Sequence, residues 1–423
     1  MLPIRRIWKS PEVRKSLLFV FALLVVTRFA AHVPVPGVNP DALTSLASGN
    51  QLFGLLNLVS GGTLTNFSVV ALGVGPYITA SIIFQLLAMI VPSMEEMQKE
   101  EQGRARINRW TRLLTVPLAF LQGYSLILLF GSQASGQAIF TDSTAFTVVL
   151  AITAMTAGTV FLMWLGELIS EKNVGNGISI IIFSGIIAGL PSGLSQAFAT
   201  YDRSQLVTVL GFAAVVVVTV VAIVVMNEAV RKIPVQYARQ MRGSRLAGAV
   251  SSFLPLKLNL GGVIPIIFAI SMILFPTTLA QFFVNATTPA VREAAQWIIR
   301  MFENQTVYAT TFAVLVFAFT FFYASVIFHP DRVAENLQKQ GGFIPGIRPG
   351  VPTAQYLGWI TNRLLLAGAT FLAIVAVLPN VVQATSGNAS LIIGGTSVLI
   401  VVSVVIDTVK QIEAQLTMRE YEL

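Results

Sequence analysis

The sequence predicts an all-α membrane protein with ten transmembrane helices, divided into two five-helix halves. Three observations support this prediction: an apolar composition, a series of long charge-free stretches, and a one-sided distribution of lysine and arginine. Of the 423 residues, 55% are hydrophobic and only 11% are charged, whereas a soluble domain carries about 25% charged residues. Because no long polar linker divides the chain, we expect one membrane-embedded body.

The charge-free stretches locate the spans, since a spanning helix needs roughly 20 mostly apolar residues. The first runs from about Leu17 to Ala31 and is interrupted only by Arg28. The others lie between Asp41 and Glu95, Arg112 and Asp142, Asp142 and Glu167, Lys172 and Asp202, Arg203 and Glu228, Lys257 and Arg292, Glu303 and Asp331, and Arg363 and Asp407. The last stretch has room for two spans, which turn formers around Pro379 and Gly387 would separate. Ten spans result.

Lysine and arginine set the orientation, because these residues are retained in cytoplasmic loops. If the basic N-terminus is inside, 23 of the 27 basic residues are assigned to the cytoplasm. The exceptions are Arg203, Arg292 and Arg300, which fall outside, and Arg28, which lies within the first span. Both termini are then cytoplasmic. Five spans in each half, residues 1–200 and 201–423, give the two halves opposite orientations, as in inverted-repeat transporters and channels.

Four segments combine glycines with aliphatic residues that follow within about one helical turn. They are Gly73–Pro76 before Ile78, Gly175–Gly177 before Ile178 and Ile182, Gly261–Gly262 before Ile267, and Gly394–Gly395 before Val398 and Ile400. Glycine permits close backbone approach, so the segments indicate either tight helix packing or a shared central constriction. None of them carries an ionisable residue of the kind that coupled transporters need. An aliphatic constriction excludes water without holding what passes.

A short apolar segment from about Leu52 to Val59 is too short to span and is followed by Ser60-Gly61-Gly62. It indicates either a re-entrant helix on the outer side or an interfacial helix that only packs. Two cytoplasmic loops, about 229–260 and 329–363, are basic. Glycine and proline between residues 341 and 350 predict a defined turn that presents Ile347 and Arg348. The loops either dock a phosphate backbone or an acidic protein face, or serve only to set topology.

The sequence offers no candidate for catalysis. It has no cysteine, and its two histidines, His32 and His329, are predicted on opposite sides of the membrane. It contains no phosphate-binding glycine loop followed by lysine, no HExxH and no nucleophile elbow. We therefore expect no enzymatic activity, no cofactor and no metal site.

Several motifs, in order along the chain, carry a resemblance to a known family. They are VPVPG at 33–37, PYITASII at 76–83, FLMWLGE at 161–167, GNGISIII at 175–182, LPLK at 254–257, PGIRPG at 345–350 and GGTS at 394–397. The chain resembles the SecY family, the channel subunits of the bacterial Sec translocon. The likeness covers essentially the whole sequence.

The resemblance implies a protein-conducting channel of the general secretory pathway, with a central pore, a short re-entrant plug helix at about 52–65 and a lateral gate toward lipid. By motif, the aliphatic pore ring falls on Val74, Ile78, Ile178, Ile182, Ile267 and Ile400. The plug corresponds to Leu52, Phe53, Leu55, Leu56, Leu58, Val59, Gly61 and Gly62. Gate residues match Thr79, Gln122 and Asn259, and docking residues match Arg239, Arg242, Arg245 and Arg348.

The resemblance also implies partners: the SecE and SecG subunits, the SecA motor ATPase or the ribosome as driver, signal peptides and nascent chains, and membrane lipids. The expected location is the bacterial cytoplasmic (inner) membrane. From the residues alone, a secondary transporter of a small apolar or peptide substrate and a membrane scaffold remain alternatives. An intramembrane acidic pair would favour the transporter, and the sequence has none in its spans.

Overall fold

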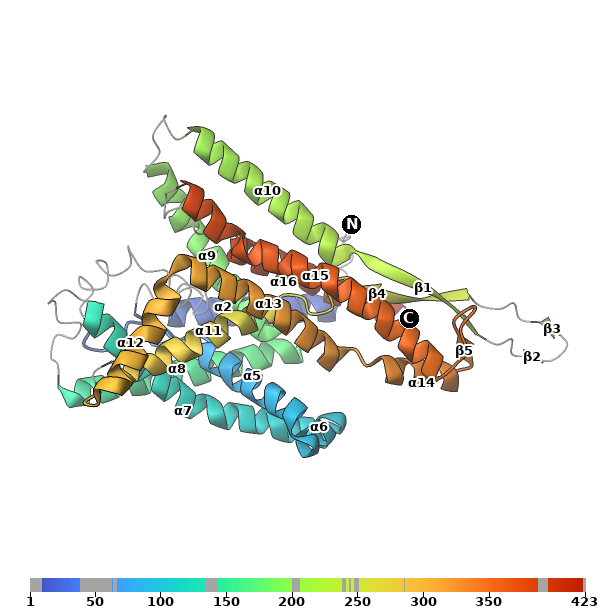
Figure 1. Ribbon diagram of the computed structural model, residues 1–423, viewed down its shortest axis with the longest axis horizontal. Coiled ribbons are helices and arrows are strands. Elements are labelled where there is room, and N and C mark those ends of the chain that lie inside the picture. The colour runs from blue at the N-terminus through green and yellow to red at the C-terminus, as the bar shows by residue number, and fades with distance from the viewer. Residues whose placement is uncertain are drawn as a thin grey trace.

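The computed structural model describes residues 10–38, 63, 67–133, 144–199, 206–237, 241–242, 245–246, 251–284, 286–386 and 395–420. In chain order its elements are α2 (Pro11–Ala30), α5 (Gly75–Ile90), α6 (Pro92–Lys99), α7 (Glu101–Gln133), α8 (Ala145–Glu171), α9 (Gly177–Ala199), α10 (Leu206–Glu228), β1 (Val230–Tyr237), β2 (Met241–Arg242), β3 (Arg245–Leu246), β4 (Ser251–Lys257), α11 (Ile264–Phe283), α12 (Pro289–Glu303), α13 (Gln305–Ile327), α14 (Pro330–Lys339), β5 (Gly342–Phe343), α15 (Val351–Ser386) and α16 (Gly395–Glu420). Most long helices run along one direction, with the strands, α6 and α14 at one end and α12 at the other (Figure 1).

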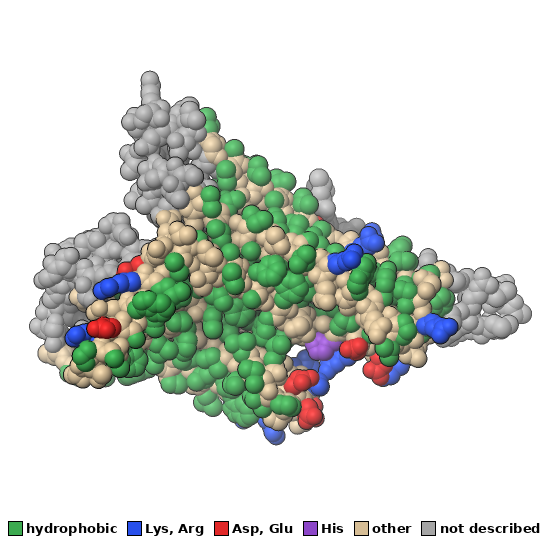
Figure 2. All heavy atoms as spheres, viewed as in Figure 1, with side chains coloured by type: hydrophobic (Ala, Val, Ile, Leu, Met, Phe, Trp, Pro, Cys, Tyr) green, Lys and Arg blue, Asp and Glu red, His purple; other side chains and the backbone are tan. Residues whose placement is uncertain are grey.

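Ten long helices occur in the described part of the chain, and one falls on each predicted span: α2, α5, α7, α8, α9, α10, α11, α13, α15 and α16. Within the described residues, five helices are long and apolar enough to cross a membrane by themselves, namely α7, α8, α11, α13 and α15. Helices α5 and α6 make a sixth if this pair, bent by 109°, is one span. Charged side chains gather at the two ends of the molecule, and the surface between them is mainly hydrophobic (Figure 2).

The predicted turn at Pro379 is wrong, because α15 continues through it to Ser386. The second predicted turn, at Gly387, lies outside the described residues. A proline is tolerated within a transmembrane helix where a neighbouring helix covers the weakened backbone. Helix α13 packs along α15, and Gln305 Nε2 donates a hydrogen bond to the carbonyl of Asn380 at 3.3 Å.

The same pattern of helix neighbours occurs twice along the chain. In the first five long helices, α5 packs on α7, α7 on α8, α8 on α9, and α2 on both α8 and α9. In the last five, α11 packs on α13, α13 on α15, α15 on α16, and α10 on both α15 and α16. The two sets of helices contact each other mainly through α5 and α7 with α11, and α9 with α16.

Each of the four glycine segments lies at the beginning of a long helix. Helix α5 begins at Gly75, α9 at Gly177 and α16 at Gly395, while α11 follows Gly262, whose φ is 59°. A positive φ is readily adopted only by glycine, so the chain can turn sharply there before the helix starts.

Gly177 is required for close packing, since a Cβ built on it would lie 1.9 Å from the carbonyl oxygen of Gly166. We expect Gly177→Ala to destabilise the protein by about 1–3 kcal/mol, because α8 and α9 must separate to relieve this backbone clash. Gly189→Ala is the matched control in the same helix, where nothing lies within 4 Å of the added Cβ. Thermal unfolding in detergent measures both variants, and an equal melting temperature for the two would contradict the prediction.

A small antiparallel sheet, which the sequence did not predict, forms from residues of the two basic loops. Strands β1 and β4 pair from Val230 opposite Lys257 to Gln236 opposite Ser251. Strand β5 adds to the other edge of β1, with Gln236 opposite Phe343. The sheet order is therefore β4-β1-β5, and it joins the two basic loops into one unit.

Candidate pore constriction and lateral gate

The six predicted ring residues come together in the largest hydrophobic cluster of the described structure. Val74, Ile78, Ile182, Ile267 and Ile400 each have an exposed fraction of 6% or less, and Ile178 packs against them partly buried. They belong to the starts of α5, α9, α11 and α16, the four helices that the glycine segments precede. Side chains remote in sequence, from helices of both sets, thus belong to one hydrophobic cluster.

This arrangement gives the cluster a simple chemistry. Aliphatic side chains offer neither hydrogen bonds nor charge, so a narrow ring of them excludes water and ions while holding no passing group. The segment before α9 also lies close to the middle of α16, since a Cβ on Gly175 would come within 3.2 Å of Thr408 Oγ1. A larger residue at Gly175 would push these two helices apart.

Two of the three predicted gate residues line one cavity. Thr79 of α5 and Gln122 of α7 both line a partly open cavity of about 50 Å³, whose other lining residues include several from α11. Ser125 Oγ of α7 donates a hydrogen bond to the carbonyl oxygen of Thr278 on α11 at 2.7 Å. This bond joins a helix of the first set to a helix of the second.

Sequence reasoning missed Ser125, Ser271 and Thr278 at this cavity. The sequence contains a signal for these residues, because each is a polar residue within an otherwise apolar predicted span. What the sequence did not reveal is that these hydroxyl groups, on α7 and α11, face the same space.

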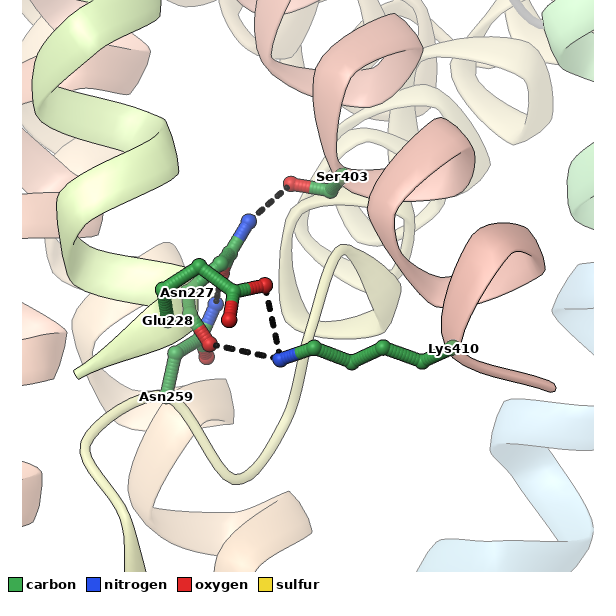
Figure 3. A network of polar contacts seen from close by, with 5 residues as sticks. All are labelled: Asn227, Glu228, Asn259, Ser403 and Lys410. Carbon is green, nitrogen blue, oxygen red and sulfur yellow. Dashed lines mark hydrogen bonds and ion pairs between the residues drawn. The ribbon is translucent and has the colours of Figure 1, made fainter. Parts of the chain in front are cut away.

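The third predicted gate residue, Asn259, takes part in a different polar network (Figure 3). Its Nδ2 donates to Asn227 Oδ1 at 2.7 Å and to the Gly262 carbonyl at 3.3 Å. Asn227 Nδ2 in turn donates to Ser403 Oγ of α16 at 3.0 Å. Asn259 does not line the cavity shared by Thr79 and Gln122, because it precedes α11 and faces the end of α10 and α16.

An ion pair strengthens the same network. Lys410 Nζ of α16 lies 2.9 Å from Glu228 Oε1 and 3.4 Å from the Asn227 carbonyl oxygen (Figure 3). Asn227 and Glu228 precede β1, and Asn259 follows β4. The network therefore bonds the base of the β1–β4 hairpin to α16. Ser403 lies about one turn from Ile400, so this network bonds to α16 close to that predicted ring residue.

We expect Ser125→Ala to make the seam between α7 and α11 easier to open. The lost hydrogen bond contributes about 0.6–2 kcal/mol, the usual value between helices in a membrane. The measurement is the export of precursors with weakened signal sequences, which should rise. Thr320→Val is the control, because Thr320 Oγ1 bonds only to Val316 within α13 among the described residues. Equal export by the two variants would count against a role for this bond.

The proposed docking residue Arg348 lies on a fixed, exposed turn. Gly346 and Gly350 have φ values of 83° and 94°, and Thr353 Oγ1 donates to the Arg348 carbonyl at 2.8 Å. Ile344 is buried in a hydrophobic cluster with residues of β1 and α15. The predicted turn is present and exposes the Arg348 side chain, but Ile347, predicted to be presented beside it, is partly buried against this cluster.

The other predicted docking and plug residues are described only in part. Arg242 of β2 pairs opposite Arg245 of β3 in a two-stranded hairpin, while Arg239 lies outside the described residues. The predicted plug residues from Leu52 to Gly62 also lie outside them. Within the plug range Thr63 is described: it is buried, and its Oγ1 donates to the Val70 carbonyl at 2.9 Å.

Comparison with known proteins identifies the family. A family model described as SecY matches residues 68–409. The chain belongs to the SecY family. Protein translocase subunit SecY of Streptomyces galbus is 43% identical over 99% of this chain and 98% of that protein. The SecY subunit of Corynebacterium glutamicum is 42% identical over 100% of this chain and 99% of that protein.

Solved structures of SecY and Sec61 channels share the fold. A structure described as that of a protein conducting channel has a TM-score of 0.64 at 18% identity, covering 95% of this chain and 92% of that one. Sec61 in the canine ribosome-channel complex from the endoplasmic reticulum gives 0.63 at 18% identity, with the same coverage. The predicted all-α membrane fold and SecY membership are confirmed, and the family is one of channels and not of enzymes.

Proposed function

We propose that this SecY family member is the protein-conducting channel subunit of the general secretory pathway. It passes unfolded secretory chains through the aliphatic ring and releases apolar segments sideways into lipid. The observation that carries the proposal is the convergence of Val74, Ile78, Ile178, Ile182, Ile267 and Ile400, from four helix starts, in one hydrophobic cluster. A ring without hydrogen-bonding groups suits substrates of any sequence.

The repeated neighbour pattern supports a division into halves 1–200 and 201–423. The halves meet at α5 and α7 with α11 on one side, and at α9 with α16 on the other. Lateral release occurs on the first side, between α5 and α7 of one half and α11 and α13 of the other. A hinge on the second side keeps the halves together.

Partition into lipid sorts the substrates. Each leucine-like residue gains a few tenths of a kcal/mol on entering the bilayer, and each aspartate or arginine costs roughly 2.5–3.5 kcal/mol at its centre. A segment of about 20 apolar residues therefore leaves through the gate, whereas a polar segment continues through the ring.

Partners supply the energy and the support. The cytoplasmic unit built from both basic loops, with Arg242, Arg245 and Arg348, receives the SecA motor or the ribosome. Two solved relatives of the same fold, canine Sec61 and the yeast Ssh1 complex, are described with ribosomes. The SecE and SecG subunits brace the halves, and the plug at 52–65 closes the outer side. The chain lies in the bacterial cytoplasmic membrane with both termini in the cytoplasm.

Site-specific crosslinking tests the proposal. A photoreactive residue at Ile182 should label a stalled secretory chain in the assembled complex. Ile169 is the matched control, because it is equally buried in the same cluster but belongs to α8 and not to a ring helix. Absence of labelling at Ile182 in an export-competent complex, or equal labelling at Ile169, would refute passage through the ring.

A further inference from the structure

We infer that the cavity between α5, α7 and α11 binds a cluster of ordered water molecules, and that this water makes the α7–α11 seam the first part of the gate to separate. The role in gate opening rests on the proposed function, whereas the water cluster rests only on the residues that line the cavity.

Ser271 provides the most direct observation. Its side chain lines the cavity and is only 4% exposed, and its Oγ has no hydrogen-bond partner among the described residues. A buried hydroxyl without a partner is unfavourable, and such groups in folded proteins are usually satisfied by protein or by ordered water. In this cavity, water can supply the missing partner.

The neighbouring hydroxyl groups need hydrogen-bond donors. Thr79 Oγ1 donates to the Gly75 carbonyl at 3.1 Å, Thr277 Oγ1 to Leu274 at 2.8 Å and Thr278 Oγ1 to Phe275 at 2.9 Å. Each hydroxyl has one hydrogen, which is thereby used within its own helix, so its oxygen remains only as an acceptor. A water molecule supplies two donors and also accepts a bond from Ser271.

The lining also excludes an ion. Its residues are Ala71, Leu72, Gly75, Thr79, Gln122, Ser125, Leu126, Leu129, Ser271, Leu274, Thr277, Thr278 and Gln281. Among these described residues there is no charged side chain to balance a bound cation or anion. The two glutamine amides and the hydroxyls suit a neutral polar ligand.

The size of the cavity matches a small cluster. At about 50 Å³ it accommodates roughly three water molecules, since one needs at least about 10–15 Å³ measured in this way and two to four polar partners. Most of its lining surface is apolar, but Ser271, Thr79 and the two glutamines offer the polar partners that a buried water needs.

Water at this place has a consequence for opening. Separating two helices that pack without water between them breaks side-chain contacts before water can replace them. Where water already lies between the helices, the polar groups are hydrated before separation, so separation costs less free energy. Among the described residues, the direct side-chain hydrogen bond between α7 and α11 is the one from Ser125 Oγ to the Thr278 carbonyl oxygen. An arriving apolar helix therefore displaces water and breaks this one side-chain hydrogen bond between the described parts of α7 and α11.

Radiolytic footprinting of the assembled complex tests the water cluster directly. Radicals formed from water during a brief X-ray exposure oxidise adjacent side chains, and mass spectrometry locates the products. We expect the buried lining residues Leu126 and Leu274 to be oxidised severalfold faster than their buried neighbours Ile127 and Ile273, which do not line the cavity. Equal rates within both pairs would overturn the inference.

Filling the cavity tests its role in the gate. Ser271→Leu, with Ser271→Val as the milder variant, should abolish the excess oxidation and slow the export of signal-bearing precursors. Loss of the excess oxidation with normal export would overturn the role in opening while leaving the water cluster in place. Because footprinting needs no substrate, it remains decisive even if the proposed channel function fails.

Discussion

Replacing both Val74 and Ile178 with glycine makes the resting channel leak small ions. Val74 is buried at the start of α5, and Ile178 packs against the same cluster from the start of α9. Removing both side chains opens the ring on two sides, and water enters once the aliphatic barrier is broken. We expect resting conductance to rise on the order of tenfold or more in planar bilayers.

The control for this prediction uses buried aliphatic residues of the same cluster outside the ring. Ile169 of α8 and Val316 of α13 are both fully buried, so the double variant Ile169→Gly with Val316→Gly loses comparable packing. Its stability should fall without a matching rise in conductance. An unchanged conductance for the ring variant, or the same leak in the control, would show that Val74 and Ile178 do not form the barrier to ions.

Arg348→Glu is expected to reduce driven export at least about tenfold, corresponding to about 1.4 kcal/mol or more of lost docking free energy. The turn around Arg348 is fixed by its glycines and by the buried Ile344, so the backbone that carries the exposed guanidinium is held in place. Reversing its charge replaces attraction to an acidic or phosphate surface with repulsion. Export of a model precursor by reconstituted complexes measures the effect.

Lys339→Glu is the matched control in the same loop. Lys339 Nζ lies 2.7 Å from Glu335 Oε1, and its hydrogen bond lowers the pKa of Glu335 below the ordinary value. Its charge is therefore already balanced, and we expect a much smaller loss of export. Both variants should insert into the membrane at the normal level. Normal export by Arg348→Glu would exclude the turn as a docking element.

Much of the membrane body could be predicted from the sequence alone. The hydrocarbon interior requires long apolar helices, so gaps between charges located the ten long helices. Glycine has a conformational freedom that other residues lack, so the four glycine segments marked the starts of α5, α9, α11 and α16. The aliphatic residues just after them are therefore identifiable from the sequence as candidates for one constriction.

Other features depend on which side chains face each other across distant segments. Only the folded structure shows that β5 joins β1, that Ser125 and Ser271 line one cavity, and that Asn259 bonds to Asn227 and does not line that cavity. It also shows that α15 passes through Pro379, where packing against α13 outweighs the local preference for a turn. Local composition determines where a helix can form in the membrane, but the direction of its polar side chains is decided by its neighbours.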